Sequence, residues 1–594
     1  MYLSEMHIDG FRGLEKIDIS FKKQQNVIIG ENNAGKTALL DALRICFEYG
    51  NQHKTIYISP DDFYFNTVCK KTVAEISFDC IFSLNKPDNE GEAALFYEFM
   101  ALSPDGTKRF ELHHRYTLDK KNGRERVRSL VWGGDNQSQT LSQYASGLLD
   151  CTYVDPLRDA DRYLKPSSGS QVGSLLRQLV PDTDKQNEMS QKLEDTLRSD
   201  AGWNALIKRG TTQINDHLKE ATFIADPQAI DMDLMPFSFK GISNSAFLRL
   251  PWPGLTQEES KQFSLKLYQN GLGLNNIIYI CTILGNIKST RENDTETYMA
   301  LLIEEPESHL HPQLQSTLFA YLNKLCDIEV QVFLTSHSPT ITAKTDLDTL
   351  SVIKRASDLT IEAFSISKSG LDANNKKYLS KFLDVTKSQL FFANGIMLVE
   401  GISEALLMEP FSTIMGIQSK EGEKYSLNRN GIEIVNVDGV AFEPFAKLFN
   451  SSDHHLRLNA RAVILTDDDR KTPSDDICDR AKKALGLESG MLKTFLAMKT
   501  FEYELVVAGK ENITTILAAY KTIHPENAKA FVVDASNETN GINFVDRIIK
   551  DGTGGKSECA QALAVYFEDH PEVRDTFIVP QYIQKAIKWL VEGK

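Results

Sequence analysis

The spacing of hydrophobic residues changes along the chain, and this change separates strands from helices. Ile17, Ile19 and Phe21 alternate with polar residues, which predicts a strand with one buried face. Continuous apolar runs predict further, buried strands at residues 27–29, 299–303 and 330–334. Helical spacing follows the first and the second of these runs. Strands that alternate with helices predict an α/β fold.

The same alternation resumes after Ser388 and predicts a second α/β unit. Three more apolar runs, each leading to acidic residues, predict strands at residues 396–399, 432–439 and 461–466. Between the two α/β regions, residues 187–200 are polar with helical spacing, but they lack the sustained heptads of a long coiled coil. We therefore expect a short helical insert that serves dimerisation. The predicted boundaries are 1–160, 161–245, 246–380 and 381–594, with the insert in the second segment.

Length and composition indicate a cytoplasmic protein of several domains. A chain of 594 residues is too long for a single core. Its eight cysteines show no Cys-x-x-Cys spacing, which indicates reduced thiols and argues against a structural zinc site. The N-terminus does not resemble a signal peptide, and no apolar run reaches the roughly 18 residues that a membrane span needs. We expect no membrane partner.

The charge balance argues against a general nucleic-acid coating protein, which is usually basic. The chain has 66 Lys and Arg against 81 Asp and Glu, a net charge of −15. Only residues 108–128 are locally basic, with eight Lys or Arg and three acids around a turn at Asn122-Gly123. The solvated face of a hairpin explains this segment better than a DNA-binding stripe. An acidic protein can still bind DNA through metal ions held by its carboxylates.

The turn after the first buried strand has the composition of a phosphate-binding loop. Its sequence, G-E-N-N-A-G-K-T, fits G-x-x-x-x-G-K-[ST] between a strand and a helix. Backbone N–H groups of such a loop surround phosphates, and Lys36 adds a point charge. Thr37 offers a hydroxyl to one Mg²⁺. We expect ATP to bind here, at Gly30, Asn33, Gly35, Lys36 and Thr37.

A second strand delivers paired carboxylates in the manner of a Walker B motif. The run at residues 299–303 ends in Glu304 and Glu305. Glu304 is expected to hold Mg²⁺ through water, and Glu305 to polarise the attacking water. His337 follows the next strand and is placed to contact a γ-phosphate, although a lone histidine there is often structural.

Between these motifs, a polar glycine-rich turn opens an apolar helix and forms a second candidate anion site. It contains Asn270, Gly271 and Gly273. With this signature turn, the segments 1–160 and 246–380 resemble an ABC/SMC-type ATPase head. In that family the turn closes on the nucleotide of a second subunit, which implies a homodimer or higher oligomer gated by ATP. The turn departs from the usual Leu-Ser-Gly-Gly-Gln.

Acidic residues follow the strands of the second α/β unit. Glu400, Glu404, Asp467 and Asp469 lie at or just after strand ends, where neighbouring parallel strands converge. Like charges so close together need neutralising cations, and oxygen ligands favour Mg²⁺ or Mn²⁺. This pattern resembles the Toprim domain of topoisomerases, primases and certain nucleases.

An SMC-like head followed by Toprim resembles the OLD (overcoming-lysogenization-defect) family of nucleases. The resemblance points to Thr500 and Glu502 as second-metal ligands and to Lys556 as the catalytic lysine. It implies hydrolysis with two metal ions, the second bound by Glu404, Thr500 and Glu502. The first ion is assigned to Glu400, Asp467 and Asp469. A surface charge remains the alternative for Glu502, and a solvated loop lysine for Lys556.

The resemblance also implies a biological setting. OLD-like proteins act in prokaryotic defence against phage, in Gabija-like or retron-associated systems. We therefore expect a DNA endonuclease regulated by its ATPase head. Its partner would be a superfamily-1 helicase or a retron reverse transcriptase with its small DNA. The alternative function is an ATP-gated DNA clamp whose Toprim domain is inactive without a partner. No separate DNA-gate domain supports a topoisomerase, and no zinc module supports a primase.

Overall fold

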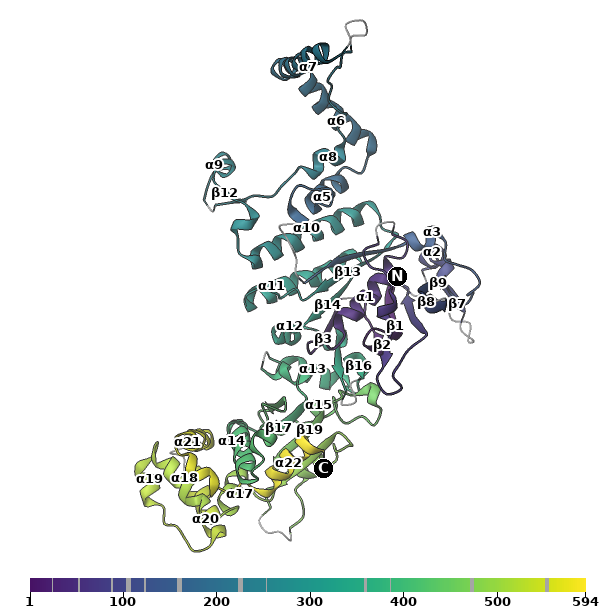
Figure 1. Ribbon diagram of the computed structural model, residues 1–594. Coiled ribbons are helices and arrows are strands. Elements are labelled where there is room, and N and C mark those ends of the chain that lie inside the picture. Colours follow the sequence, from purple (N-terminus) through teal and green to yellow (C-terminus); the bar gives the residue numbers. More distant parts are fainter. Residues whose placement is uncertain are drawn as a thin grey trace. The chain divides into compact units, whose positions relative to one another are not determined.

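In the computed structural model the chain forms two units. The first contains residues 1–147 and 331–594, and the second contains residues 148–330 (Figure 1). The structure describes residues 1–23, 25–51, 54–86, 89–102, 108–121, 124–156, 163–222, 228–252, 254–356, 360–384, 386–470, 475–550 and 555–593.

The first unit begins with an antiparallel sheet in the order β2-β1-β6-β8-β7, with β9 paired to β8. Its strands are β1 (Tyr2–Phe11), β2 (Leu14–Ser20), β6 (Glu75–Ser83), β7 (Met100–Leu102), β8 (Lys108–Lys121) and β9 (Arg124–Gly133). The pairing of β8 with β9 confirms the predicted basic hairpin, whose turn residues Asn122 and Gly123 lie outside the described residues. The hydrophobic pattern did not predict β1, because a register shift between Leu3 and Glu5 interrupts its alternation.

The phosphate-binding loop extends from a second sheet of this unit. Four of the six strands of this sheet are β14 (Val330–Ser336), β3 (Asn26–Gly30), β15 (Leu350–Arg355) and β16 (Ile361–Ser365). β3 pairs in parallel with β14 and β15, whereas β16 is an antiparallel neighbour of β15. Every residue of β3 is buried, as expected for a central strand. Helix α1 (Lys36–Phe47) follows β3, and α12 (Pro339–Lys344) follows β14.

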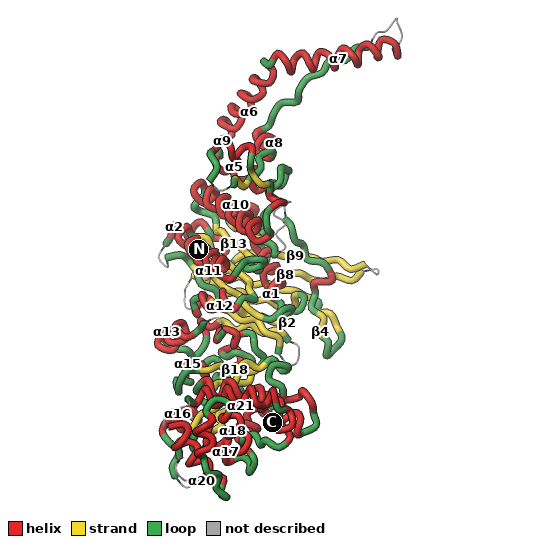
Figure 2. The backbone as a smooth tube through the Cα atoms, turned by 90° about the vertical axis from the view of Figure 1, so that its left-hand side faces the viewer, coloured by secondary structure: helices red, strands yellow, loops and turns green. Residues whose placement is uncertain are grey.

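The second unit pairs β10 (Leu149–Val154) in parallel with β13 (Tyr298–Glu304). Its main helices are α5 (Gln171–Leu179), α6 (Thr183–Arg198), α7 (Ala201–Ala221), α8 (Phe239–Asn244), α10 (Leu272–Asn293) and α11 (Pro312–Asn323). Helices α6 and α7 extend away from the two strands (Figure 2). α7 contains no buried residue. These helices occupy the segment in which the sequence predicts a helical insert.

The C-terminal part of the first unit is a four-stranded parallel sheet in the order β18-β17-β19-β20. The strands are β17 (Gly395–Val399), β18 (Ile432–Asn436), β19 (Arg461–Asp467) and β20 (Leu492–Ala497). Flanking helices include α14 (Ile402–Gln418), α16 (Asp479–Leu485), α17 (Phe501–Val507), α21 (Lys556–Asp569) and α22 (Gln581–Glu592). The predicted α/β fold class is confirmed. Among the described residues, no helix is long and apolar enough to cross a membrane.

Candidate active sites

Backbone geometry forms the phosphate-binding loop of the first unit. A side chain at Gly30 would place its Cβ 2.1 Å from the Ile353 carbonyl oxygen, and Gly35 has a φ of 95°. Glycine is therefore required at both positions. Lys36 Nζ donates to the carbonyls of Gly30 (3.1 Å) and Glu31 (2.8 Å) and lies 3.4 Å from His337 Nδ1. The structure thus brings together two predicted phosphate-contacting side chains, on α1 and after β14.

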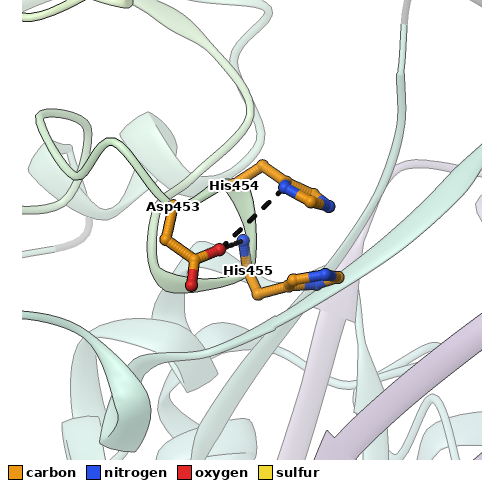
Figure 3. Close-up of side chains that lie close together, drawn as sticks. All are labelled: Asp453, His454 and His455. Carbon is orange, nitrogen blue, oxygen red and sulfur yellow. Dashed lines mark hydrogen bonds and ion pairs between the residues drawn. The ribbon is translucent and has the colours of Figure 1, made fainter.

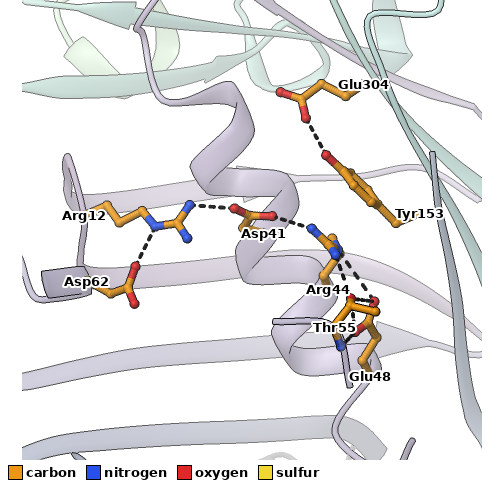
Figure 4. Close-up of polar contacts among 8 residues, drawn as sticks. All are labelled: Arg12, Asp41, Arg44, Glu48, Thr55, Asp62, Tyr153 and Glu304. Atoms are coloured by element: carbon orange, nitrogen blue, oxygen red, sulfur yellow. Dashed lines mark hydrogen bonds and ion pairs between the residues drawn. The ribbon is translucent and has the colours of Figure 1, made fainter. Parts of the chain in front are cut away.

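Three ion pairs form a chain at helix α1, and one of them, Arg12–Asp41, ties the helix to the turn between β1 and β2 (Figure 4). Arg12, between β1 and β2, donates to Asp62 at 2.8 Å and to Asp41 at 2.6 Å. Arg44 donates to the second oxygen of Asp41 at 2.9 Å. The sequence motifs did not reveal this arrangement, because Arg12 and Asp62 lie outside the loop and its helix.

The Walker B carboxylates lie in the second unit. Glu304 is buried at the end of β13 and accepts a hydrogen bond from the Tyr153 hydroxyl at 2.7 Å (Figure 4). Tyr153, on β10, carries no motif and was missed by sequence reasoning. Glu305 has a left-handed φ of 45°, which turns the chain out of the strand. Ser308 Oγ lies 3.4 Å from the Glu305 carboxylate.

The signature turn belongs to the second unit as well. Gly271 caps α10, and a side chain there would meet no atom within 4 Å. At Gly273 an added Cβ would lie 2.4 Å from the His309 carbonyl oxygen. Asn276 donates to the Ser308 carbonyl at 3.2 Å. Packing therefore requires glycine at Gly273, whereas Gly271 and the neighbouring Asn270 lie at the start of the helix.

Strand ends position the carboxylates of the C-terminal sheet. Glu400, just after β17, accepts hydrogen bonds from Thr466 Oγ1 and from the Asp467 backbone N–H at 3.0 Å. Asp467, at the end of β19, is only 8% exposed. Glu404 lies in the first turn of α14, close enough to Glu400 and Glu502 for their charges to interact with its own.

Helix starts supply the remaining predicted ligands. Thr500 caps α17 by accepting a bond from the Tyr503 N–H at 3.3 Å. Glu502, in the first turn of that helix, is buried. Lys556, the first residue of α21, places its Nζ 3.1 Å from Glu502 Oε1. The position of this lysine against a buried carboxylate differs from that of a freely solvated loop residue.

The carboxylates of this group, two buried and two half-buried, repel one another. Burial, with added repulsion from Glu400, Glu404 and Glu502, raises the pKa of Asp467 to about 9. Burial, with repulsion from Glu502 and Glu400, raises the pKa of Glu404 to about 7. For Lys556, partial burial lowers the pKa, but attraction to Glu502 and its neighbours outweighs this and raises it overall. The oxygen ligands and excess negative charge of this group fit divalent cations such as Mg²⁺ or Mn²⁺.

Asp469 has a different environment from the other predicted ligands. Its φ is 56°, and its carboxylate is 54% exposed and accepts a bond from Arg480 Nη2 at 2.9 Å. The same nitrogen donates to the Asp467 carbonyl at 2.8 Å and lies 3.8 Å from Glu400 Oε1. Sequence reasoning missed Arg480, which follows the strand end by more than ten residues. Asp468, between the two predicted ligands, is fully buried and accepts a bond from the Cys478 N–H at 2.8 Å.

A separate group of metal-type side chains lies in the loop between β18 and β19. Asp453, His454 and His455 each place one ligand atom within 4.8 Å of the others (Figure 3). All three residues are exposed, and Asp453 Oδ1 already accepts the His455 N–H at 2.9 Å. The histidines line a cavity of about 340 Å³ that also contains Glu15 and Glu362. No sequence motif pointed to this group.

Comparison with known proteins identifies both parts of the chain. A family model described as an AAA ATPase domain matches residues 1–146 and 151–342. A model described as the Toprim domain of overcoming-lysogenization-defect-like proteins matches residues 391–469. The chain belongs to the OLD family of ATPase–Toprim proteins. This confirms the family resemblance seen in the sequence.

Relatives of this OLD-family chain match it along most of their length. The OLD nuclease of Thermus scotoductus is 23% identical over 412 residues, covering 68% of this chain and 72% of the relative. The endonuclease GajA of Bacillus cereus is 23% identical over 484 residues, covering 80% and 76%. The Old nuclease of Escherichia phage P2 is 22% identical over 554 residues, covering 90% and 87%.

Solved structures match parts of the OLD-family chain. The C-terminal region of the Burkholderia pseudomallei OLD protein is 25% identical, with a TM-score of 0.25, and covers 34% of this chain and 98% of that one. An Smc head domain from Pyrococcus furiosus is 12% identical, with a TM-score of 0.36, and covers 64% and 100%.

Proposed function

We propose that this OLD-family protein is a metal-dependent DNA endonuclease whose cutting is regulated by ATP. The observation that carries the proposal is a group of four carboxylates with Lys556 beside it. Asp467 and Glu502 are buried, and Glu400 and Glu404 are half-buried. Burying like charges is costly unless cations neutralise them, so such a group is typical of a metal-binding active site. The nuclease names of the relatives support the same activity.

In this proposal the carboxylates hold two ions, Mg²⁺ or Mn²⁺. Glu400, Asp467 and Asp469 are assigned to one ion, and Glu404, Thr500 and Glu502 to the other. Bound together, the two ions would supply a nucleophilic water and stabilise the leaving oxygen of a phosphodiester. Lys556 holds Glu502 in place and stabilises the negative charge that develops on the scissile phosphate. Thr466 and the Asp467 N–H orient the Glu400 carboxylate.

We assign the ATP-binding function to the head. Lys36 and Thr37 would hold the phosphates of ATP and its Mg²⁺, together with Glu304. Glu305 and His337 would position the attacking water and the γ-phosphate. The signature turn, with Asn270, Gly271 and Gly273, would contact the nucleotide of a second copy of the chain in a homodimer or larger oligomer. Nucleotide binding would then set access to DNA, and hydrolysis would reset it.

Plasmid cleavage tests the proposal directly. Purified protein is incubated with supercoiled plasmid and Mg²⁺ or Mn²⁺, with and without ATP, beside Glu400→Ala and Lys36→Ala. We expect metal-dependent nicking or linearisation that Glu400→Ala abolishes, while Lys36→Ala changes only its response to ATP. Cleavage that survives Glu400→Ala would overturn the assignment of the active site. Absence of cleavage of both plasmid and single-stranded DNA would favour the clamp.

The proposed biological role is defence against phage, with a helicase or a retron reverse transcriptase as partner. We expect expression of the chain with its neighbouring genes to reduce phage plating, and Glu400→Ala to restore it. Protection that persists in Glu400→Ala would separate defence from DNA cutting. It would then favour the ATP-gated clamp, whose function needs no intact carboxylate group.

A further inference from the structure

We propose that Arg480 is a displaceable counter-cation of the Toprim metal site. Its guanidinium occupies the Asp469 carboxylate until a divalent ion takes that place, and is then available to a DNA phosphate. The proposal rests on the two-metal site proposed above and adds a residue with a regulatory role to it. It assigns Arg480 to metal loading and to binding of the substrate backbone.

The position of Arg480 carries the first step. A single nitrogen, Nη2, lies 2.9 Å from Asp469 Oδ2 and 3.8 Å from Glu400 Oε1. Both carboxylates are assigned to the same ion, so the guanidinium holds its positive charge where that ion's charge is needed. Arginine stays protonated at any physiological pH. Metal and guanidinium therefore compete for the same negative charge.

The contacts of Arg480 are of a kind that an ion can displace. All three use Nη2, so Asp469 is not gripped by the two-pronged geometry that makes arginine–carboxylate pairs strong. Asp469 is 54% exposed and the Arg480 side chain 35%, so water screens the pair. Arg480 Nε is buried and, within the described part of the chain, has no hydrogen-bond partner. This donor is unused while Nη2 is held by Asp469, and it can reach a new acceptor only when the guanidinium moves.

The start of helix α16 fixes the location of Arg480. The Cys478 N–H donates to the fully buried Asp468 at 2.8 Å, which ties the residue before the helix to the end of β19, where Asp467 and Asp469 lie on either side of Asp468. The two halves of the carboxylate group thus each have their own cation. Lys556 serves Glu502, and Arg480 serves Asp469.

Metal and DNA affinity, measured separately on the full chain, test this role. Mn²⁺ binding is followed by calorimetry on metal-free protein. DNA binding is followed with a labelled duplex in the presence of Ca²⁺, which commonly lets metal-dependent nucleases bind DNA without cleaving it. We compare Arg480→Gln, Arg480→Lys and a control, Lys482→Gln. Lys482 lies on the same helix, is 55% exposed, and pairs with Asp479 at 3.7 Å. The control removes the same charge from the helix outside the carboxylate group.

The expected result is a pair of opposite changes. Arg480→Gln should bind Mn²⁺ about threefold to tenfold more tightly and bind DNA several-fold more weakly. Arg480→Lys should lie between Gln and the wild type in both, and Lys482→Gln should match the wild type. Weaker or unchanged Mn²⁺ binding in Arg480→Gln would overturn the proposal, as would unchanged DNA binding. Should Arg480→Gln fail to fold, Arg480→Lys decides by the same two signs. Loss of Mn²⁺ binding in Glu400→Ala verifies the proposed metal site independently of Arg480. Failure of the metal-site proposal can therefore be distinguished from failure of the role proposed for Arg480.

Discussion

The phosphate-binding loop and the Toprim carboxylate group carry charges of opposite sign, and they balance these charges in different ways. In the loop, the Lys36 ammonium donates hydrogen bonds to two neutral backbone carbonyls. Gly30 lets the loop backbone pack closely against the Ile353 carbonyl. In the carboxylate group, the acids Glu400, Glu404, Asp467, Asp469 and Glu502 outnumber the two cations beside them, Lys556 and Arg480. The first site is complete in backbone geometry, whereas the second is balanced only when cations enter. The stability of the loop should therefore depend little on its ligand, whereas the stability of the carboxylate group should depend strongly on metal.

The largest expected effect is the loss of DNA cleavage when one proposed metal-binding carboxylate is removed. Asp467→Asn should lower metal-dependent DNA cleavage by at least about 100-fold, because it removes a charge assigned to an ion that stabilises the transition state. Asp438→Asn provides a control, since this exposed acid follows β18 in the same sheet. Initial cleavage rates in Mg²⁺ measure both variants. Equal loss in the two would show that fold damage, and not loss of a ligand, is the cause.

In the absence of metal, Asp467→Asn should stabilise the protein, although it lowers cleavage. Asp467 has a raised pKa in the folded protein, about 9 against roughly 3.9 in an unfolded chain. Its contribution to the free energy of unfolding is therefore fully favourable below about pH 4 and is lost as the pH rises toward 9. At neutral pH, Asp467→Asn should raise the Tm of the metal-free protein by a few degrees and reduce the Tm gain caused by Mn²⁺.

Calorimetric scans at pH 5.5, 7 and 8.5, with chelator or with Mn²⁺, measure this effect. The metal-free wild type should lose Tm relative to Asp467→Asn as the pH rises. A difference that does not depend on pH would mean that the carboxylates are already balanced by other groups.

A glycine pair sharpens the comparison within the ATPase part. Gly273→Ala should cost about 1–3 kcal/mol of stability, because its Cβ would lie 2.4 Å from the His309 carbonyl oxygen. Gly271→Ala meets no atom and should leave stability nearly unchanged. Chemical denaturation of both variants tests this. If Gly271→Ala nevertheless lowers ATP hydrolysis, the effect belongs to the proposed contact with nucleotide.

The smallest predicted effect concerns Tyr153. Tyr153→Phe removes the 2.7 Å hydrogen bond to the buried Glu304, with an expected cost of about 0.5–1.5 kcal/mol. Without this bond the Glu304 carboxylate is held less precisely and should bind Mg²⁺–ATP less well, which raises the KM for ATP several-fold. Steady-state ATP hydrolysis across Mg²⁺ concentrations measures it, with Tyr144→Phe, at an exposed tyrosine, as the control. Unchanged KM would leave the bond with a structural role alone.

The sequence predicted those parts of the sites that are contiguous in the chain. The phosphate-binding loop, the Glu304–Glu305 pair and the acids after β17 and β19 follow directly from a strand ending in characteristic residues. Tyr153, Arg12 and Arg480 could not be predicted in this way, because only tertiary contacts bring them to their partners. Asp469 was grouped with Asp467 by spacing, yet its left-handed backbone places its carboxylate with Arg480. Strand β1 escaped prediction because its bulge breaks the alternation.

The close approach of Gly273 to His309 also bears on how natural variation in this family should be interpreted. A glycine retained at this position would reflect a requirement of folding, because a larger residue destabilises the protein whether or not ATP is bound. A glycine retained at position 271 would testify to function, since folding places no demand on it. Two neighbouring glycines of one motif would thus be retained for different physical reasons.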